Sequence, residues 1–270
     1  MQTFGKKENI LIIIAALAIV ALTGVLNHIY GLRPWTEFLI SIAGYVGIGI
    51  GAFSGLYAAH KIGTRNFVGK GLCLLGISMS LNVIGYLLWD YYEVILGMEV
   101  PYPSLADVSY SLAIPFAIAG VAMLLRIYQP QIKGRFLLEA IIMSGVLAFI
   151  VISIVGWPNL SESTYTAGFF DIIYTLTDVV WLALAYIILR IAGGRIFKGL
   201  FVYTIAIIVL AVGDILFALR IAAETYYYGD ISDLTLLLGW ILATAGIYLT
   251  AQTFSSSSTA TPTASVAPHA

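Results

Sequence analysis

Apolar stretches of about 20 residues recur along almost the whole of this 270-residue chain. A helix of that length covers the ~30 Å hydrocarbon core of a bilayer, so each stretch predicts a transmembrane helix. Short polar connections separate the stretches, and several of them contain Gly or Pro, which favour turns. The pattern predicts eight helices, over residues 9–29, 36–59, 68–90, 104–128, 136–156, 167–192, 199–222 and 232–253.

The composition favours an all-α, polytopic integral membrane protein. Hydrophobic residues make up 60% of the chain and charged residues 10%, and the mean hydropathy is +0.97. A soluble domain usually carries about 25% charged residues, because water must solvate its surface. The lipid bilayer is therefore the expected partner of most of this surface. No basic stripe with interleaved aromatic residues is present, so no nucleic-acid partner is expected. The single cysteine, Cys73, excludes a disulfide within one chain.

The two ends of the chain differ from its middle. Lys6 and Lys7 precede an apolar segment that is long enough to span a bilayer and lacks a clear cleavage site. We therefore expect a retained first helix rather than a signal peptide. Residues 1–254 are predicted to form one transmembrane domain. Residues 255–270 are rich in Ser, Thr, Pro and Ala and are predicted to form a disordered tail.

Lysine and arginine are distributed unevenly between the two predicted sides. Eleven of the thirteen lie in the N-terminal segment and the even-numbered connections, and two lie in the odd-numbered connections. The positive-inside rule places the richer side in the cytoplasm. We therefore expect a multi-pass protein of the cell membrane with both termini cytoplasmic. Lys133 and Arg195 are predicted to lie inside, and Glu162 and Tyr227 outside.

The third and fourth predicted helices resemble the seventh and eighth. A tandem duplication of four helices, residues 1–130 and 131–254, explains the likeness; chance similarity of apolar helices is the alternative. Because four is an even number, the halves would be parallel repeats related by a pseudo-two-fold axis along the membrane normal. The paired positions are Lys70-Gly71-Leu72 with Lys198-Gly199-Leu200, Gly85 with Gly213, and Asp107 and Gly120 with Asp233 and Gly246, thirteen residues apart in each case.

Two acidic residues lie inside predicted helices, Asp178 near mid-depth of the sixth and Asp214 in the seventh. An ionised side chain at the bilayer centre costs at least ~2.5–3.5 kcal/mol on insertion scales, so buried acids indicate function. We expect both to converge on an outward-open polar cavity with aromatic walls that binds a small molecule or an ion. The alternative is that each acid bonds a hydroxyl or Arg220 and only fixes helix packing. The candidate ligand-binding residues are Asp178, Asp214, Asp171, Asn82, Tyr86, Trp89, Asp107, Tyr110 and Trp181, with Phe217 and Trp240 as further walls.

Other polar residues have simpler interpretations. Asn82 is expected to hold helices together through its amide. Asp107 and Asp233 have capping-box spacing at helix starts, in Ser104–Asp107 and Asp230–Asp233, so capping is their expected role. Glu139, beside Arg135, is expected at the cytoplasmic interface. A second feature is a glycine stripe, Gly47, Gly51 and Gly55, that permits close backbone approach within the chain or across a dimer.

Several classes of site are excluded by what the chain lacks. No lysine lies in mid-membrane, which argues against a retinal Schiff base. The three histidines, His28, His60 and His269, are too far apart to build a bis-histidine haem or a zinc site. No Gly-x-Ser-x-Gly elbow or phosphate loop occurs. The sequence identifies no catalytic residue, no metal ligand and no cofactor.

Three stretches resemble the multi-helix N-terminal membrane sensor modules of microbial diguanylate cyclases, phosphodiesterases and histidine kinases. They are Trp89-Asp-Tyr-Tyr-Glu-Val-Ile-Leu-Gly-Met-Glu-Val-Pro-Tyr-Pro-Ser-Leu-Ala-Asp-Val-Ser-Tyr110, Leu176-Thr-Asp178 and Gly213-Asp-Ile-Leu-Phe217. The resemblance covers the third to eighth predicted helices and implies a sensory, ligand-responsive role. The sequence departs from the modules in that only a tail follows the last helix. Output is therefore expected to pass through a protein partner or a homo-oligomer.

Two classes of function follow from these features. The first is a membrane sensor or ligand-binding module with an outward pocket at Asp178 and Asp214. The second is a small proton- or cation-coupled transporter, or a subunit of one, that uses the same two acids. An enzyme is the third and least favoured class, because two carboxylates can bind a divalent metal but further ligands are not evident.

Overall fold

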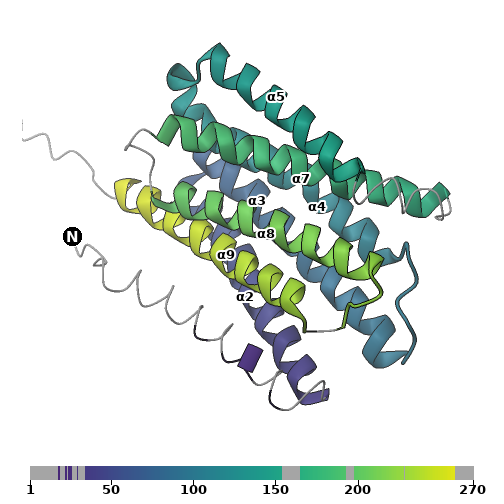
Figure 1. Cartoon of the computed structure of the whole chain (residues 1–270). Coiled ribbons are helices and arrows are strands. Elements are labelled where there is room, and N and C mark those ends of the chain that lie inside the picture. Colours follow the sequence, from purple (N-terminus) through teal and green to yellow (C-terminus); the bar gives the residue numbers. More distant parts are fainter. Residues whose placement is uncertain are drawn as a thin grey trace, which may run out of the picture.

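The computed structural model describes residues 34–153, 165–192, 198–227 and 229–258, together with five single positions between 18 and 29. Across these residues the chain consists of helices and their connections, without a β-strand (Figure 1). The helices are α2 (Pro34–Ile62), α3 (Phe67–Asp90), α4 (Leu105–Leu125), α5 (Gly134–Val151), α7 (Tyr165–Ala192), α8 (Lys198–Ala222) and α9 (Ile231–Ser258). A π-helical turn, Tyr91–Ile95, extends α3, and a 3₁₀ turn, Arg126–Gln131, follows α4.

Six of these helices, α2, α3, α4, α7, α8 and α9, are long and apolar enough to cross a bilayer. The prediction of an all-helical, multi-pass membrane protein is confirmed at this level. Every described helix begins within two residues of a predicted start. The tail boundary was wrong by four residues, since α9 continues from residue 254 to Ser258. The first predicted helix, residues 9–29, and the tail beyond Ser258 lie outside the described residues, apart from single positions.

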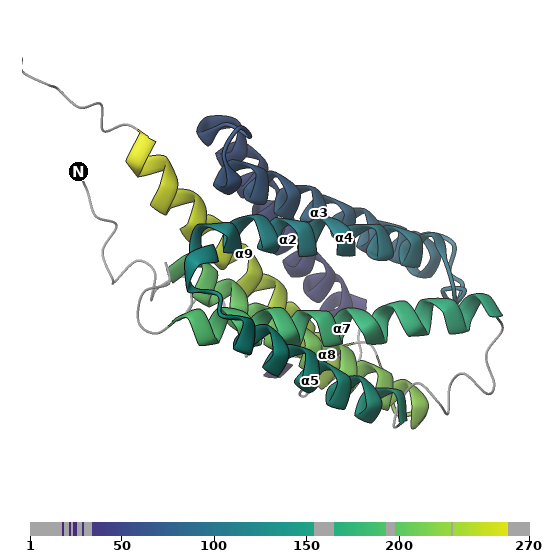
Figure 2. The same cartoon turned by 90° about the horizontal axis from the view of Figure 1, so that it is seen from above.

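The six long helices form a closed ring in the order α2, α3, α4, α7, α8, α9, in which each packs on the next and α9 returns to α2. The joint between α4 and α7 is the least extensive of the six, and α5 packs outside the ring on α7. Figure 2 shows α3 and α4 on one side of the molecule and α7 and α8 on the other. Side chains that face the ring interior therefore come from helices far apart in sequence.

Glycine residues bring the helices of two hairpins, α3–α4 and α8–α9, into close contact. A Cβ atom on Gly71 would lie 3.0 Å from the carbonyl oxygen of Gly120, and one on Gly199 would lie 2.8 Å from that of Gly246. Near the other end of each hairpin, Gly85 packs against Tyr110 and Gly213 against Leu236. Glycine is required at these contacts because a larger side chain would force the helices apart.

The glycine stripe of α2 also packs within the chain. Gly51 lies against Thr244 of α9, whose hydroxyl donates to the carbonyl oxygen of Gly47 at 2.8 Å. A Cβ atom on Gly55 would meet the backbone of α3 at Leu72 and Gly76. Of the two uses that the sequence left open for this stripe, the structure therefore displays close packing between helices of one chain.

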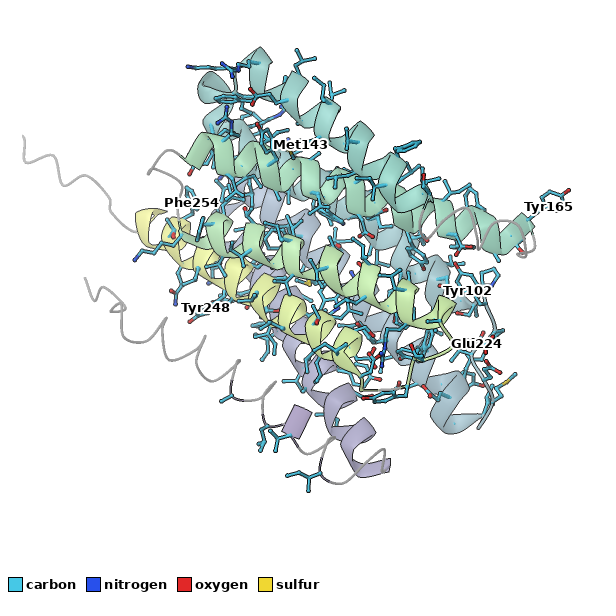
Figure 3. The ribbon with its side chains drawn as sticks, viewed as in Figure 1. Tyr102, Met143, Tyr165, Glu224, Tyr248 and Phe254 are labelled. Carbon is cyan, nitrogen blue, oxygen red and sulfur yellow. The ribbon has the colours of Figure 1, made fainter. Side chains whose placement is uncertain are left out.

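The bundle has two chemically distinct ends. The tyrosine-rich end contains the connections 91–104 and 223–230, and the basic end contains the connections 63–66 and 126–133 with the last turn of α7. Figure 3 shows Tyr102, Tyr165 and Glu224 at the first end and Phe254 at the second. The largest fully buried apolar side chains lie in the middle or in the basic half of their helices: Ile48, Leu72, Leu75, Leu124, Ile188, Leu200 and Ile247. The polar interior lies toward the tyrosine-rich end.

Candidate functional site

The carboxyl groups of Asp178 on α7 and Asp214 on α8 lie within hydrogen-bonding range of each other. A hydrogen bond between them requires a proton on one of the two groups, because two ionised carboxylates have only acceptors. The arrangement therefore suits a pair of acids that shares one proton. The sequence predicted that these two residues converge, and the structure brings them together at the joint between α7 and α8.

The two acids differ in exposure. Asp178 is buried, with 7% of its surface exposed, whereas Asp214 is an exposed residue. Asp214 lies close enough to Tyr86 for its charge to act on the tyrosine hydroxyl, although Tyr86 belongs to α3 on the other side of the ring.

Tyr86 is the centre of an aromatic cluster formed by four helices. Its hydroxyl accepts a hydrogen bond of 3.0 Å from the indole N–H of Trp240 on α9. Its ring makes edge contacts with Tyr45 of α2 and Tyr110 of α4, at centroid distances of 6.2 and 5.5 Å. Trp240, Tyr110 and Tyr86 were predicted as walls of the site, and the structure places all three together.

Two tyrosine–aspartate hydrogen bonds connect α7 to the start of α4 across the least extensive joint of the ring. Tyr174 of α7 donates to Asp107 of α4 at 2.8 Å. In the opposite direction, Tyr102, in the connection before α4, donates to Asp171 of α7 at 2.5 Å. These bonds hold together the two sides of the ring one to two helical turns from Asp178.

The capping box predicted at Ser104–Asp107 is complete, whereas the one predicted at Asp230–Asp233 is formed only in part, because Asp233 accepts from Gly229 and not from the Asp230 N–H. Ser104 and Asp107 form a complete capping box at the start of α4, in which the Asp107 carboxylate accepts from the Ser104 backbone N–H at 2.7 Å. At the start of α9, Asp233 accepts from the backbone N–H of Gly229 and from the hydroxyl of Tyr226. Asp107 therefore caps α4 and binds Tyr174 with its other oxygen atom.

Asp230 adds an ion pair to the start of α9. Its side chain is fully buried and accepts a hydrogen bond of 2.8 Å from the Arg220 guanidinium at the end of α8. It also accepts from the backbone N–H and the hydroxyl of Ser232. Burial opposes ionisation, but these hydrogen bonds from Ser232 and Arg220 outweigh it and hold the pKa of Asp230 below its ordinary value.

Other predicted residues have local partners. Trp89 donates to Glu93 of the following π-helical turn at 3.1 Å. Phe217 packs against Tyr226. Asn82 is buried, and its amide donates to the carbonyl oxygen of Ser78 one turn earlier in the same helix. This hydrogen bond lies within α3 and does not make the link to another helix that the sequence predicted. Trp181 is half-buried and packs against the apolar core.

Sequence reasoning missed Tyr45 and Asp90, which form a hydrogen bond between α2 and α3. Asp90 also accepts from Ser41. Asp90 stands at the last position of α3, where a carboxylate is expected to be solvated, so no partner was predicted for it. The signal available was Ser41 and Tyr45, four residues apart and therefore on one face of α2.

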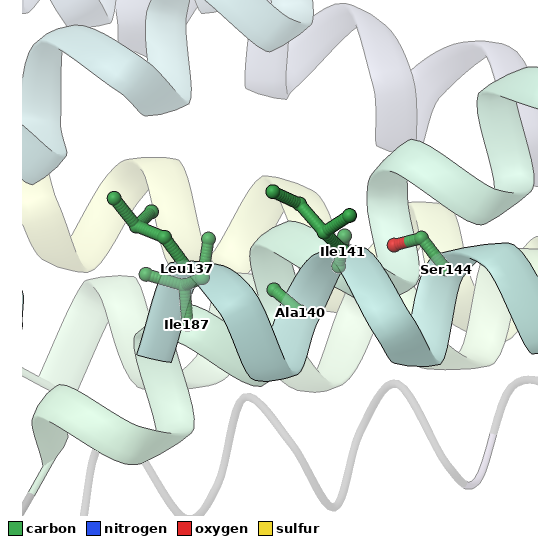
Figure 4. Close-up of a pocket in the computed structure, with 6 residues that line it drawn as sticks. Leu137, Ala140, Ile141, Ser144 and Ile187 are labelled. Atoms are coloured by element: carbon green, nitrogen blue, oxygen red, sulfur yellow. The ribbon is translucent and has the colours of Figure 1, made fainter. Parts of the chain in front are cut away.

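Two hollows lie away from this cluster. A groove of about 370 Å³ between α5 and α7 is lined by Leu137, Ala140, Ile141, Ser144, Ala183 and Ile187, and is almost wholly apolar (Figure 4). In the described part of the chain, no three His, Cys, Asp or Glu side chains lie close enough together to hold a metal ion. The chemistry of the interior is therefore that of one carboxyl pair and its tyrosine neighbours.

Comparison of the chain with protein-family models, with curated proteins and with solved structures gives no match. The functional argument therefore rests on the arrangement of these side chains.

Proposed function

We propose that this protein is a membrane-embedded sensory or ligand-binding module that binds a small cationic ligand at Asp178 and Asp214. One observation carries the proposal: two carboxyl groups from different helices lie within hydrogen-bonding range of each other beside a tyrosine cluster in a ring of helices. A cation, or an ammonium group that donates hydrogen bonds, can take the place of the shared proton, because both carboxylates then face a positive charge.

The proposed architecture has eight transmembrane helices in two parallel repeats, with both termini in the cytoplasm of a cell. The matched glycine contacts of the α3–α4 and α8–α9 hairpins support a repeat, since Gly71 with Gly120 corresponds to Gly199 with Gly246. The ring order supports it too, because α2, α3 and α4 are followed by α7, α8 and α9. Collection of the described lysines at one end supports the orientation.

Under this repeat, Tyr86 and Asp214 occupy matched positions, one residue after Gly85 and Gly213. Asp214 is close enough for its charge to act on the Tyr86 hydroxyl, which is what a pseudo-two-fold axis near both residues would produce. One half therefore supplies the acid and the other an aromatic hydroxyl. This asymmetry suits a site for one small ligand, which needs a charged group and a hydrogen-bonding wall.

Signalling is proposed to pass to a protein partner or to a second copy of the chain, as the resemblance to sensor modules implies. The joint between α4 and α7 is the place where a ligand at Asp178 would act first. The Tyr174–Asp107 and Tyr102–Asp171 bonds close that joint in this structure. A ligand that altered the position of α7 would change these bonds and so the connection before α4.

The proposal is tested on purified full-length protein by infrared spectroscopy, which detects a protonated carboxyl group directly. Wild type is expected to give this signal at neutral pH, and Asp178→Asn and Asp214→Asn are each expected to lose it. Glu224→Gln, which changes an exposed carboxylate at the same end, is the matched control and is expected to keep it. Absence of the signal from wild type would refute the shared proton.

Binding is tested by thermal unfolding in the presence of sodium, potassium and a series of small primary amines. At least one of these cations is expected to raise the melting temperature of wild type and of Glu224→Gln in a saturable manner. The same cation should have no effect on Asp178→Asn. Equal stabilisation of wild type and Asp178→Asn by every active cation would place binding elsewhere.

A proton- or cation-coupled transporter is the second candidate, favoured by the same shared proton, which a cation could displace and carry along. Proteoliposomes distinguish the two candidates. A transporter moves the stabilising cation across the bilayer with an opposing proton flux that Asp178→Asn abolishes, whereas a sensor binds the cation without flux.

A further inference from the structure

Two adjoining hollows lie on the outer surface of the ring. The hollow of Figure 4 lies between α5 and α7, and a second, of about 240 Å³, lies between α4 and α5. Leu137 and Ile187 line both hollows, so the two adjoin over α7 and are together called the groove. The groove exists because α4 and α5 both pack on α7 but not extensively on each other.

The groove runs from the basic end of the bundle into the depth of one leaflet. From Leu137 to Ser144 along α5 the distance is about 10 Å at 1.5 Å per residue. A leaflet contributes about half of the ~30 Å hydrocarbon thickness, so the groove covers most of the depth of one acyl chain. Its walls are almost wholly apolar, as an acyl chain requires.

Positive charge surrounds the mouth of the groove. Arg126 is one of the residues that line the second hollow. Arg190 lies one helical turn beyond Ile187, and Lys133 and Arg135 stand at the start of α5. Against these four cations stands Glu139, which pairs with Arg135 at 2.6 Å and Arg190 at 3.1 Å. The mouth therefore keeps a surplus of positive charge.

Arg126 and Lys133 are the two of these four cations that have no carboxylate partner among the described residues, and Arg126 is the one that lines the groove. Arg126 also stacks over the ring of Phe67 at 5.0 Å. A guanidinium at the membrane interface binds phosphate well, because its planar fork matches two phosphate oxygens. An apolar groove that ends at such a group is complementary to a phospholipid rather than to a soluble ligand.

We propose that this groove is a binding site for one anionic phospholipid, whose acyl chain lies over α7 between α4 and α5 and whose headgroup contacts Arg126. Basic pockets between helices on the cytoplasmic side of a membrane are suited to anionic headgroups, and the anionic lipids concentrate in that leaflet. The site lies outside the ring and is independent of the function proposed for Asp178 and Asp214.

The test is native mass spectrometry of the full-length protein with phosphatidylglycerol and phosphatidylcholine of identical acyl chains. Wild type is expected to retain one phosphatidylglycerol per chain in preference to phosphatidylcholine. Arg126→Gln should bind phosphatidylglycerol about fivefold more weakly, the effect of one basic residue near a membrane surface. Arg126→Lys keeps the charge and should bind within about twofold of wild type.

The matched control is Lys61→Gln, which removes another cation that lies over an aromatic ring, that of Tyr57, at the basic end but away from the groove. It is expected to bind phosphatidylglycerol like wild type. A second variant, Ser144→Phe, fills the inner part of the groove without altering charge and should also weaken binding. Equal retention of both lipids, equal effects of Arg126→Gln and Lys61→Gln, or full binding by Ser144→Phe would each overturn the proposal.

Discussion

The hairpins α3–α4 and α8–α9 share a packing scheme but differ in the polar groups that they present. In both, a glycine near the start of the first helix contacts a glycine of the second: Gly71 with Gly120, and Gly199 with Gly246. In both, a glycine further along the first helix lies against a large side chain of the second: Gly85 with Tyr110, and Gly213 with Leu236. The spacing of these glycines sets how closely the two helices of each hairpin approach.

The residue after the second glycine is where the hairpins diverge. Tyr86 in the first hairpin is bonded to Trp240 and contacts two further aromatic rings, whereas Asp214 in the second lies within hydrogen-bonding range of the Asp178 carboxyl group. A membrane interior tolerates both, because each polar group has a partner there. Shared positions therefore maintain the packing, and divergent positions determine the chemistry of the ring interior.

The largest expected effect tests the shared packing. Gly199→Ala should destabilise the protein by about 3 kcal/mol, because its Cβ would lie 2.4 Å from the backbone nitrogen of Thr250. Gly71→Ala should cost less, about 1 kcal/mol, because its Cβ would mainly displace the flexible side chain of Leu124, at 2.9 Å. Unfolding free energies measured by denaturant titration in micelles provide the comparison.

Gly145→Ala is the control for both glycine variants. A Cβ atom on Gly145 would meet no heavy atom within 4 Å, so alanine should be neutral or slightly stabilising in the middle of α5. A Gly71→Ala protein less stable than Gly199→Ala would contradict this order, which rests on the shorter contact to the backbone at Gly199.

The next effect concerns the ion pair between Arg220 and Asp230, which lies at the connection between α8 and α9 in the second hairpin. Arg220→Gln should destabilise the protein by about 2 kcal/mol, because it removes a charged hydrogen bond from the fully buried Asp230. Arg135→Gln is the matched control. Arg135 pairs with Glu139 while 79% of its own side chain is exposed, so its loss should cost less than about 0.5 kcal/mol. Similar losses for the two variants would mean that Asp230 is not held by Arg220.

A smaller effect is expected from acid. The folded state holds the pKa of Asp230 below its ordinary value, which is near 3.9. Above about pH 3.9 the ionised Asp230 therefore makes its full contribution to the stability of the fold. The contribution is lost as pH falls through the pKa of the folded state. Stability measured between pH 6 and pH 3 should therefore fall more steeply for wild type than for Arg220→Gln, in which the pKa of Asp230 is less depressed. Parallel profiles would contradict the assignment.

How much of this could be read from the sequence depended on the range of each interaction. Helix starts were predicted within two residues, because membrane spans depend on local hydropathy alone. The capping box at Ser104 was predictable because both partners lie within four residues. The convergence of Asp178 and Asp214 was also predictable, since unpaired acids at membrane depth need partners and these two lie on consecutive helices.

Contacts between distant helices were out of reach. Nothing in the pattern indicates that Tyr45 bonds Asp90 or that Trp240 bonds Tyr86, because both need the ring order of the helices. The predicted wall residue Trp89 shows the converse error. It lies one helical turn from Tyr86, but its indole donates to Glu93 in the next turn. An aromatic near an interior site need not face it.

The smallest expected effect compares the caps that begin α4 and α9. Ser104→Ala should cost about 1 kcal/mol, the usual effect of losing a cap side chain. The loss is limited because the Asp107 carboxylate still accepts from the backbone N–H of residue 104 and from Tyr174. Ser104→Thr restores the hydroxyl and should recover most of the stability, as denaturant titration can measure. A loss well above that of Arg220→Gln would reverse the order argued here, since it would mean that the first hairpin depends on its cap more than the second depends on its ion pair.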